Sequence, residues 1–147
     1  FEVPEIEDEE PYQIGKAKIR KKGSDITLVS YSKTMLTVLE AAKQLEDAGI
    51  SAEVIDLVTL SPWDKETVLE SVKKTGHLCI CHEAVKQGGF GAEIAATAAE
   101  EAFDSLKGPV LRLAAPFTPV PFAPSMENKV RVHVDDIVNA ITKTLKG

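Results

Sequence analysis

The fold is decided by the sequence LCICHEAVKQGGFGAE, residues 78–93. Its first four residues form an apolar run that is too short for a helix and lacks polar alternation, so they predict a strand buried on both faces. Gly88, Gly89 and Gly91 then allow a positive φ or very close backbone packing. Apolar residues recur at helical spacing after this loop, and Glu93 stands in the first turn, where the helix dipole favours an anion. A strand, a glycine loop and a helix follow one another, and we expect a ligand or a partner chain at their junction.

Strand-like runs alternate with amphipathic helical runs along the rest of the chain, as in a sheet that helices cover on both faces. The expected strands cover residues 16–22, 26–31, 52–60, 78–81 and 109–115. Only Gly23 and Ser24 separate the first two strands, a spacing short enough for an antiparallel turn. Over residues 15–147 we therefore predict an α/β domain of three layers, α/β/α. Its sheet is five-stranded, mixed and mostly parallel, with one antiparallel edge strand.

Capping residues and prolines mark where the helices begin and end. Ser32 and Ser61 each precede a helical pattern and are the expected N-caps, and Asp64 is placed to bond back to the start of the second helix. Gly76 is expected to end that helix. The prolines of residues 116–124 predict a loop without regular structure.

Right-handed crossovers bring the loops after the parallel strands to one edge of the sheet, where we expect any site. These loops follow Tyr31, Leu60, Glu83 and Ala115. Three aromatic residues lie on them: Trp63, Phe117 and Phe122. Trp63 either covers the core or anchors an interface.

The composition is that of a globular protein, with 44% hydrophobic and 27% charged residues among 147. At this length one core suffices without a metal or a disulfide. No apolar stretch approaches the roughly 20 residues of a membrane helix, so we expect no membrane contact and no signal peptide. The net charge of −6, without an offsetting basic stripe, predicts that the chain does not bind nucleic acid.

Cys79 and Cys81 are the only cysteines. We expect their side chains to lie on opposite faces of the strand, unable to form a disulfide and inert in the core. Free cysteines fit a reducing compartment, either a bacterial cytoplasm or an organelle matrix.

Known catalytic patterns are not completed by these residues. Gly89 and Gly91 match the first two positions of a dinucleotide fingerprint, but Ile94 stands where its third glycine belongs. The pair His82-Glu83 does not start a zinc motif, because Lys86 occupies the position of the second histidine. We assign no catalytic residue and no metal ligand. His82 either acts as a general base or hydrogen-bonds the loop backbone, and the glycines are expected to admit another polypeptide.

Several stretches resemble, in order and spacing, the carboxyl-terminal domain of the β subunit of thiamine-diphosphate-dependent 2-oxo acid dehydrogenases of the pyruvate, branched-chain or acetoin type. They are residues 15–17, 23–29, 49–57, 71–76, 82–84, 88–93 and 119–124. The same type of domain ends transketolases. The acidic residues 1–14 resemble the linker from a preceding pyrimidine-binding domain.

The resemblance implies an oxidoreductase of α2β2 composition that decarboxylates a 2-oxo acid and passes the acyl group to lipoyl on an acyltransferase core. Thiamine diphosphate and Mg²⁺ are implied to bind other domains, so this fragment alone is expected to hold no cofactor and to be inactive. Its implied partners are a second β subunit, the α subunit and the subunit-binding domain of the dihydrolipoyl acyltransferase.

Two surfaces follow from the resemblance by position. The subunit-interface loop and its neighbouring aromatics are expected at His82, Glu83, Gly88, Gly89, Phe90, Gly91, Glu93, Trp63, Phe117 and Phe122. The acyltransferase-binding surface is expected at Lys107, Lys146 and Gly147.

Three residues depart from the family pattern, in which Val58 is usually arginine, Phe117 aspartate and Lys107 acidic in bacterial relatives. These changes put the usual charge pairing with partners in question. Two other interpretations stay open. One is a small-ligand module of flavodoxin-like shape, with the glycine loop as an anion cradle. The other is the equivalent domain of a transketolase.

Overall fold

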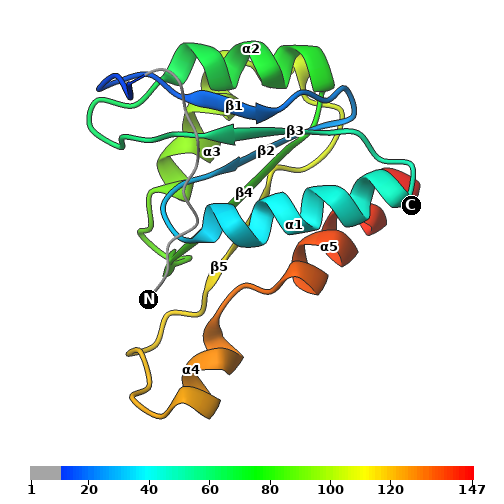
Figure 1. Ribbon diagram of the computed structural model, residues 1–147. Helices are drawn as coiled ribbons and strands as arrows, with labels where there is room; N and C mark the ends of the chain where they lie inside the picture. Colours follow the sequence, from blue (N-terminus) through cyan, green and yellow to red (C-terminus); the bar gives the residue numbers. More distant parts are fainter. Residues whose placement is uncertain (1–10) are drawn as a thin grey trace.

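One five-stranded mixed sheet forms the centre of the molecule in a computed structural model that describes residues 11–147 (Figure 1). The strands are β1 (Lys18–Lys21), β2 (Ile26–Ser30), β3 (Ala52–Asp56), β4 (Leu78–Val85) and β5 (Leu111–Ala115). They lie in the order β1-β3-β2-β4-β5, and all neighbours are parallel except the antiparallel pair β1 and β3. The predicted sheet is confirmed. Most of the predicted linker, residues 1–10, lies outside the described residues.

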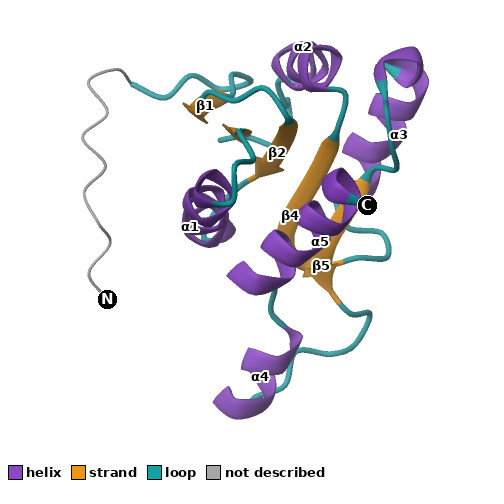
Figure 2. Ribbon diagram, turned by 90° about the vertical axis from the view of Figure 1, so that its right-hand side faces the viewer, coloured by secondary structure: helices purple, strands orange, loops and turns teal. Residues whose placement is uncertain are grey.

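Helices cover both faces of the sheet (Figure 2). The main ones are α1 (Thr34–Asp47), α2 (Lys65–Thr75), α3 (Gly91–Glu101) and α5 (Val134–Lys146). One face packs on α1 and α5, and the other packs on α2 and α3. A 3-10 turn (Phe103–Ser105) follows α3, and the short α4 (Pro124–Val130) lies beyond the end of β5. These are the three predicted layers.

The core consists of two apolar clusters, one on each side of the sheet. In β2, Leu28 packs toward α1 and the adjacent Val29 packs toward α2, and both are completely buried. Successive side chains of a strand point to opposite faces, so a strand covered on both sides needs an unbroken apolar run. This explains why the central strands show no polar alternation.

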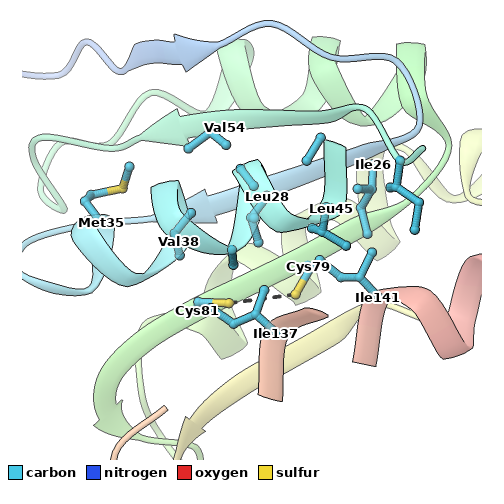
Figure 3. Close-up of a cluster of buried hydrophobic side chains, with 14 residues drawn as sticks. Ile26, Leu28, Met35, Val38, Leu45, Val54, Cys79, Cys81, Ile137 and Ile141 are labelled. Atoms are coloured by element: carbon cyan, nitrogen blue, oxygen red, sulfur yellow. Dashed lines mark hydrogen bonds between the residues drawn. The ribbon is translucent and has the colours of Figure 1, made fainter. Parts of the chain in front are cut away.

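The two cysteines lie on the same face of β4, so the expectation of opposite faces was wrong. Side chains two residues apart in a strand point in the same direction. The sulfur atoms of Cys79 and Cys81 are 3.8 Å apart in the cluster beside Ile137 and Ile141 (Figure 3). Both are free, fully buried thiols. The contact with Cys79, together with burial, raises the pKa of Cys81, which keeps this thiol protonated and unreactive.

The first strand is antiparallel as predicted, but its neighbour is β3, not β2 as a tight turn requires. Ile19 pairs with Ile55. The connecting residues cross the start of β3, where the amides of Ser24 and Asp25 both donate to the carbonyl of Ser51. A Cβ at Gly23 would overlap the backbone of Ala52, so this crossing requires glycine. The short connection between β1 and β2 therefore passes over the start of β3, which comes later in the sequence.

The N-cap of α2 is Asp64, and the prediction of Ser61 was wrong. The Asp64 carboxylate accepts hydrogen bonds from the amide of Thr67 at 3.2 Å, its hydroxyl at 2.9 Å and the amide of Ala17 at 3.0 Å. Burial alone would raise the pKa of Asp64, but these bonds and nearby Lys16 outweigh it and lower the pKa. This carboxylate therefore ties the start of α2 to the segment before β1.

Other helix ends divide between confirmed and corrected predictions. Gly76 ends α2 with a φ of +78°, as predicted. Ser32 is not a cap: it has a φ of 56° in the turn before α1, and Lys33 is the N-cap. Residues 116–123 form a loop as expected, but α4 begins at Pro124, which suits the first turn of a helix. No helix in the described part of the chain combines the length and apolar character needed to cross a membrane.

We predict that Asp64→Ala lowers the free energy of unfolding by about 1–2 kcal/mol at neutral pH, because α2 loses its cap. A carboxyl whose folded pKa is lowered stabilises the protein above its ordinary pKa and loses that effect as pH falls. The deficit should therefore shrink in acid. Urea unfolding at several pH values measures it. Glu66→Ala, at an exposed position in the same turn, is the control, and an equal loss in both variants would contradict the assignment.

Candidate functional site

Four rings meet at the carboxyl edge of the parallel strands, where a site was expected. Tyr31 follows β2, Trp63 lies between β3 and α2, His82 belongs to β4, and Phe90 precedes α3. The rings of Tyr31 and His82 stack with centroids 5.8 Å apart. Phe90 meets Tyr31 edge-on at 6.5 Å and Trp63 at 5.9 Å. Three of these residues were predicted here. Tyr31 was named only as a strand end, and its position there is the signal that was available.

The imidazole of His82 fills the space that the glycine loop leaves. Its side chain is completely buried, and its Nδ1 lies 3.1 Å from the carbonyl oxygen of Ala84. A Cβ at Gly91 would lie 2.5 Å from Nε2 of the ring, and one at Gly89 would lie 2.7 Å from Cε1. The two glycines therefore make room for a side chain of their own chain. The interpretation that the loop also admits another polypeptide stays a prediction, since nothing lies within 4 Å of a Cβ at Gly88 on the same loop.

His82 is held in its neutral form. Burial lowers its pKa, the Ala84 carbonyl opposes that effect, and the charge of Arg112 adds to it. Because a carbonyl only accepts, Nδ1 carries the proton and Nε2 is left as a bare acceptor with no partner among the described residues. Nε2 faces Gly91 inside the protein, so no substrate reaches it. Of the two roles weighed for His82, the geometry supports the bond to the loop backbone.

The remaining predicted interface residues lie around this cluster at the surface. Glu83, Gly88 and Glu93 are exposed. Phe117 and Phe122 do not join the rings: they lie on residues 116–130, which we call the edge arm. Phe117 is 73% exposed, Phe122 is fully exposed, and Val120 and Met126 on the same arm are also exposed. The arm therefore presents apolar side chains that the described residues leave uncovered.

The second predicted surface lies at the amino edge of the sheet. Lys107 and Lys146 line one hollow of about 360 Å³, together with Asp25 and His77. The stem of Lys107 packs on Gly76, and Lys146 Nζ donates to the carbonyl of Ala48 at 2.7 Å. Gly147 follows directly in the chain. The structure thus brings these three residues together at the edge opposite the ring cluster.

The glycine loop does not fit thiamine diphosphate with Mg²⁺. Its inner side is filled by the His82 ring, where a diphosphate cradle would need open backbone amides. No group of three or more His, Cys, Asp or Glu residues within residues 11–147 is arranged to hold a metal ion. No reaction step is assigned to the carboxyl edge for these reasons.

Together these observations define an α/β domain with helices on both faces of its sheet and a cluster of packed rings at the carboxyl edge. The sequence profile of the family described as transketolase, C-terminal domain, matches residues 15–137. The chain therefore belongs to the transketolase C-terminal domain family.

Curated relatives are β subunits of 2-oxo acid and acetoin oxidoreductases. The chain is 42% identical to the mitochondrial pyruvate dehydrogenase E1 component subunit beta of Dictyostelium discoideum, over 95% of this chain and 40% of that protein. It is 42% identical to the acetoin:2,6-dichlorophenolindophenol oxidoreductase subunit beta of Bacillus subtilis, over 98% and 42%. It is 49% identical to the mitochondrial 2-oxoisovalerate dehydrogenase subunit beta of D. discoideum, over 82% and 32%. The chain thus spans less than half the length of each.

A solved structure described as a split gene transketolase, inactive beta4 tetramer, superposes with a TM-score of 0.83 at 31% identity. The match covers 98% of this chain and 46% of that one. A 2-oxoglutarate:ferredoxin oxidoreductase from Magnetococcus marinus shares the fold at 12% identity and a TM-score of 0.57, over 90% of this chain and 20% of that one. The overall architecture is therefore that of the family.

We predict that Gly91→Ala lowers the free energy of unfolding by about 1–3 kcal/mol, because the added methyl group overlaps the His82 ring. Part of this loss should disappear in the His82→Ala background, where the ring is absent. Gly88→Ala is the control, since nothing lies within 4 Å of its Cβ position and its cost arises from a φ of +74°. Urea unfolding of the single and double variants measures the coupling, and purely additive losses at Gly91 and His82 would refute the contact.

A pH dependence follows from the lowered pKa of His82. Burial also lowers the pKa of His77, with a contribution from Lys107. Below the ordinary pKa of 6.5 the unfolded chain binds protons that the folded chain resists, so stability is complete above this pH and falls below it. We expect His82→Asn and His77→Asn each to flatten part of the fall in the urea midpoint between pH 6.5 and about 5. An unchanged slope in both variants would contradict this explanation.

Proposed function

We propose that this chain is the carboxyl-terminal assembly domain of the β subunit of a 2-oxo acid dehydrogenase. The observation that carries the proposal is the set of uncovered apolar side chains on the edge arm. Exposed apolar residues gathered in one region mark interaction sites on soluble proteins. Identity of 42–49% to β subunits of pyruvate and 2-oxoisovalerate dehydrogenases, across most of the chain, supports this role over a free-standing one.

In this proposal the complete enzyme oxidatively decarboxylates pyruvate or a related 2-oxo acid and transfers the acyl group to lipoyl. Thiamine diphosphate and Mg²⁺ bind other domains, and residues 1–14 lead from a preceding pyrimidine-binding domain. The fragment alone is inactive. It works in a bacterial cytoplasm or an organelle matrix, as the bacterial and mitochondrial relatives suggest, and binds neither nucleic acid nor a membrane.

The proposed subunit partners are a second β subunit and the α subunit. The predicted interface residues would meet them, with the edge arm giving the apolar contacts and Glu83 and Glu93 the polar rim. The superposed transketolase chain is described as part of a β4 tetramer, which supports association between β subunits. The heterotetramer itself is part of the proposal.

The acyltransferase's subunit-binding domain would bind Lys107, Lys146 and Gly147. These residues share one hollow or adjoin it, at the opposite edge from the arm. The edge arm and the hollow can then be occupied at the same time, so the subunit could pair with other subunits while it binds the acyltransferase. Because the surface carries two lysines, it would select carboxylates on that partner.

The two other interpretations differ in support. The small-ligand module needs the glycine loop as an anion cradle, and the His82 ring fills that loop. The equivalent domain of a transketolase is favoured by the split transketolase structure, while the relatives at 42–49% identity favour the 2-oxo acid dehydrogenase. Transfer of an acyl group to lipoyl, rather than a ketol group to an aldose, by the complete enzyme separates them.

We predict that Phe122→Asp in the complete β subunit weakens association with the α subunit or a second β subunit by at least tenfold, because a charge would be buried in an apolar contact. Sedimentation of co-expressed subunits measures the fraction assembled. Phe103→Asp is the control, since Phe103 is 71% exposed after α3 and outside the arm. Equal assembly of the wild type and the Phe122 variant would remove the arm from the proposal, and decarboxylation by the 147-residue chain with added cofactor would overturn the proposal itself.

A further inference from the structure

The outer edge of β5 is not covered by another strand within the described residues, because β5 ends the sheet and pairs with β4 alone. An edge strand presents backbone amide and carbonyl groups that a strand from another chain can bind. Two hollows flank this edge, of about 380 and 460 Å³. Both are open to solvent, and both are lined by Lys86, Arg112 and Pro116.

The two hollows lie on different faces of the sheet. The first, which we call the basic hollow, reaches Asp136 and Asn139 of α5 and is also lined by Lys129 and Arg131. The second, which we call the apolar hollow, reaches Ala92 of α3 and is closed by Phe117. A strand added beside β5 would send alternate side chains to these two faces. Each hollow could therefore accept every second side chain of the added strand.

The charge at this edge is opposite to that of the whole chain. Four cations line the basic hollow, Lys86, Arg112, Lys129 and Arg131, against one carboxylate, Asp136, in a protein of net charge −6. Asp136 already accepts the amide of His133 at 2.9 Å.

Three of the cations have no carboxylate partner within residues 11–147. Arg131 pairs with Glu127, but Lys86, Arg112 and Lys129 take part in none of the ion pairs found among the described residues. The Arg112 guanidinium is held in place by a bond of 3.1 Å to the carbonyl of Lys86. Cations beside an edge strand can also discourage unwanted pairing with other strands. That role would not require a hollow on each face of the sheet, and it would not require an apolar hollow.

We propose that the outer edge of β5 binds an extended segment of a partner protein in which acidic and apolar residues alternate. The segment adds to the sheet beside β5, its carboxylates enter the basic hollow, and its apolar side chains enter the apolar hollow beside Phe117. The unpaired cations select acidic segments, and the strand edge supplies the backbone bonds. This surface is separate from the hollow that contains Lys107 and Lys146, and it shares Phe117 and Lys129 with the edge arm.

Fluorescence anisotropy with labelled peptides of about ten residues tests the proposal on the 147-residue chain. A peptide of alternating Glu and Val should bind, and binding should weaken in about 0.5 M salt. The same peptide with Gln for Glu, and one with its Glu and Val residues in two blocks, should each bind at least tenfold more weakly. Equal binding of all three peptides, or no binding, would overturn the proposal.

Charge-reversed variants locate the site. Lys86→Glu with Lys129→Glu should weaken binding at least tenfold, whereas Lys73→Glu with Lys143→Glu changes the net charge equally at exposed positions elsewhere and should leave it unchanged. Thermal unfolding checks that both proteins fold. Amide hydrogen exchange in residues 111–115 should slow when the peptide binds. Equal effects of the two pairs of changes, no protection of β5, or tighter binding of a single-stranded oligonucleotide than of the peptide would each refute the assignment.

Discussion

The packing of the neutral His82 ring between the glycine loop and Tyr31 determines how the carboxyl edge of the sheet is finished. The bond between Nδ1 and the Ala84 carbonyl lies where the pairing of β4 with β5 shifts its register, between His82 and Val85. Gly89 and Gly91 then bring the start of α3 against the ring. Through this one contact the strand end, the loop and the helix adopt a single arrangement.

Most of the fold was predictable because it depends on patterns along the chain. Unbroken apolar runs predict strands buried on both faces, and Gly76 predicts the end of α2. The neighbour of β1 was not predictable from spacing, since the crossing at Gly23 depends on β3, which comes later in the chain. The two cysteines are different: the period of a strand places Cys79 and Cys81 on one face, and that rule was available from the sequence.

The sequence predicted the edge of the sheet where the candidate site lies, but not why the glycines are needed there. Trp63, His82 and Phe90 do meet at one edge, because parallel strands bring their carboxyl ends together. The group for which these glycines make room was not predictable. Gly91 follows His82 by nine residues, and only the path of the loop shows that Gly91 comes back to the His82 ring. A glycine signals close approach, and the sequence does not say whether the approaching group belongs to the same chain.

The packing of the rings at the carboxyl edge changes what this part of the fold is suited to do. In open α/β sheets a ligand occupies the crevice at the strand ends, and the aromatic residues there line it. Here Phe90 packs on Tyr31 and Trp63, and Tyr31 stacks on His82, so these rings stabilise one part of the edge. A hollow of about 290 Å³ remains beside Lys33, His82 and Ala115. The apolar side chains that remain available lie farther out, on the edge arm, and the cations without a carboxylate partner among residues 11–147 lie beside β5. Contacts with other polypeptides are therefore what these exposed apolar and basic side chains are suited to make.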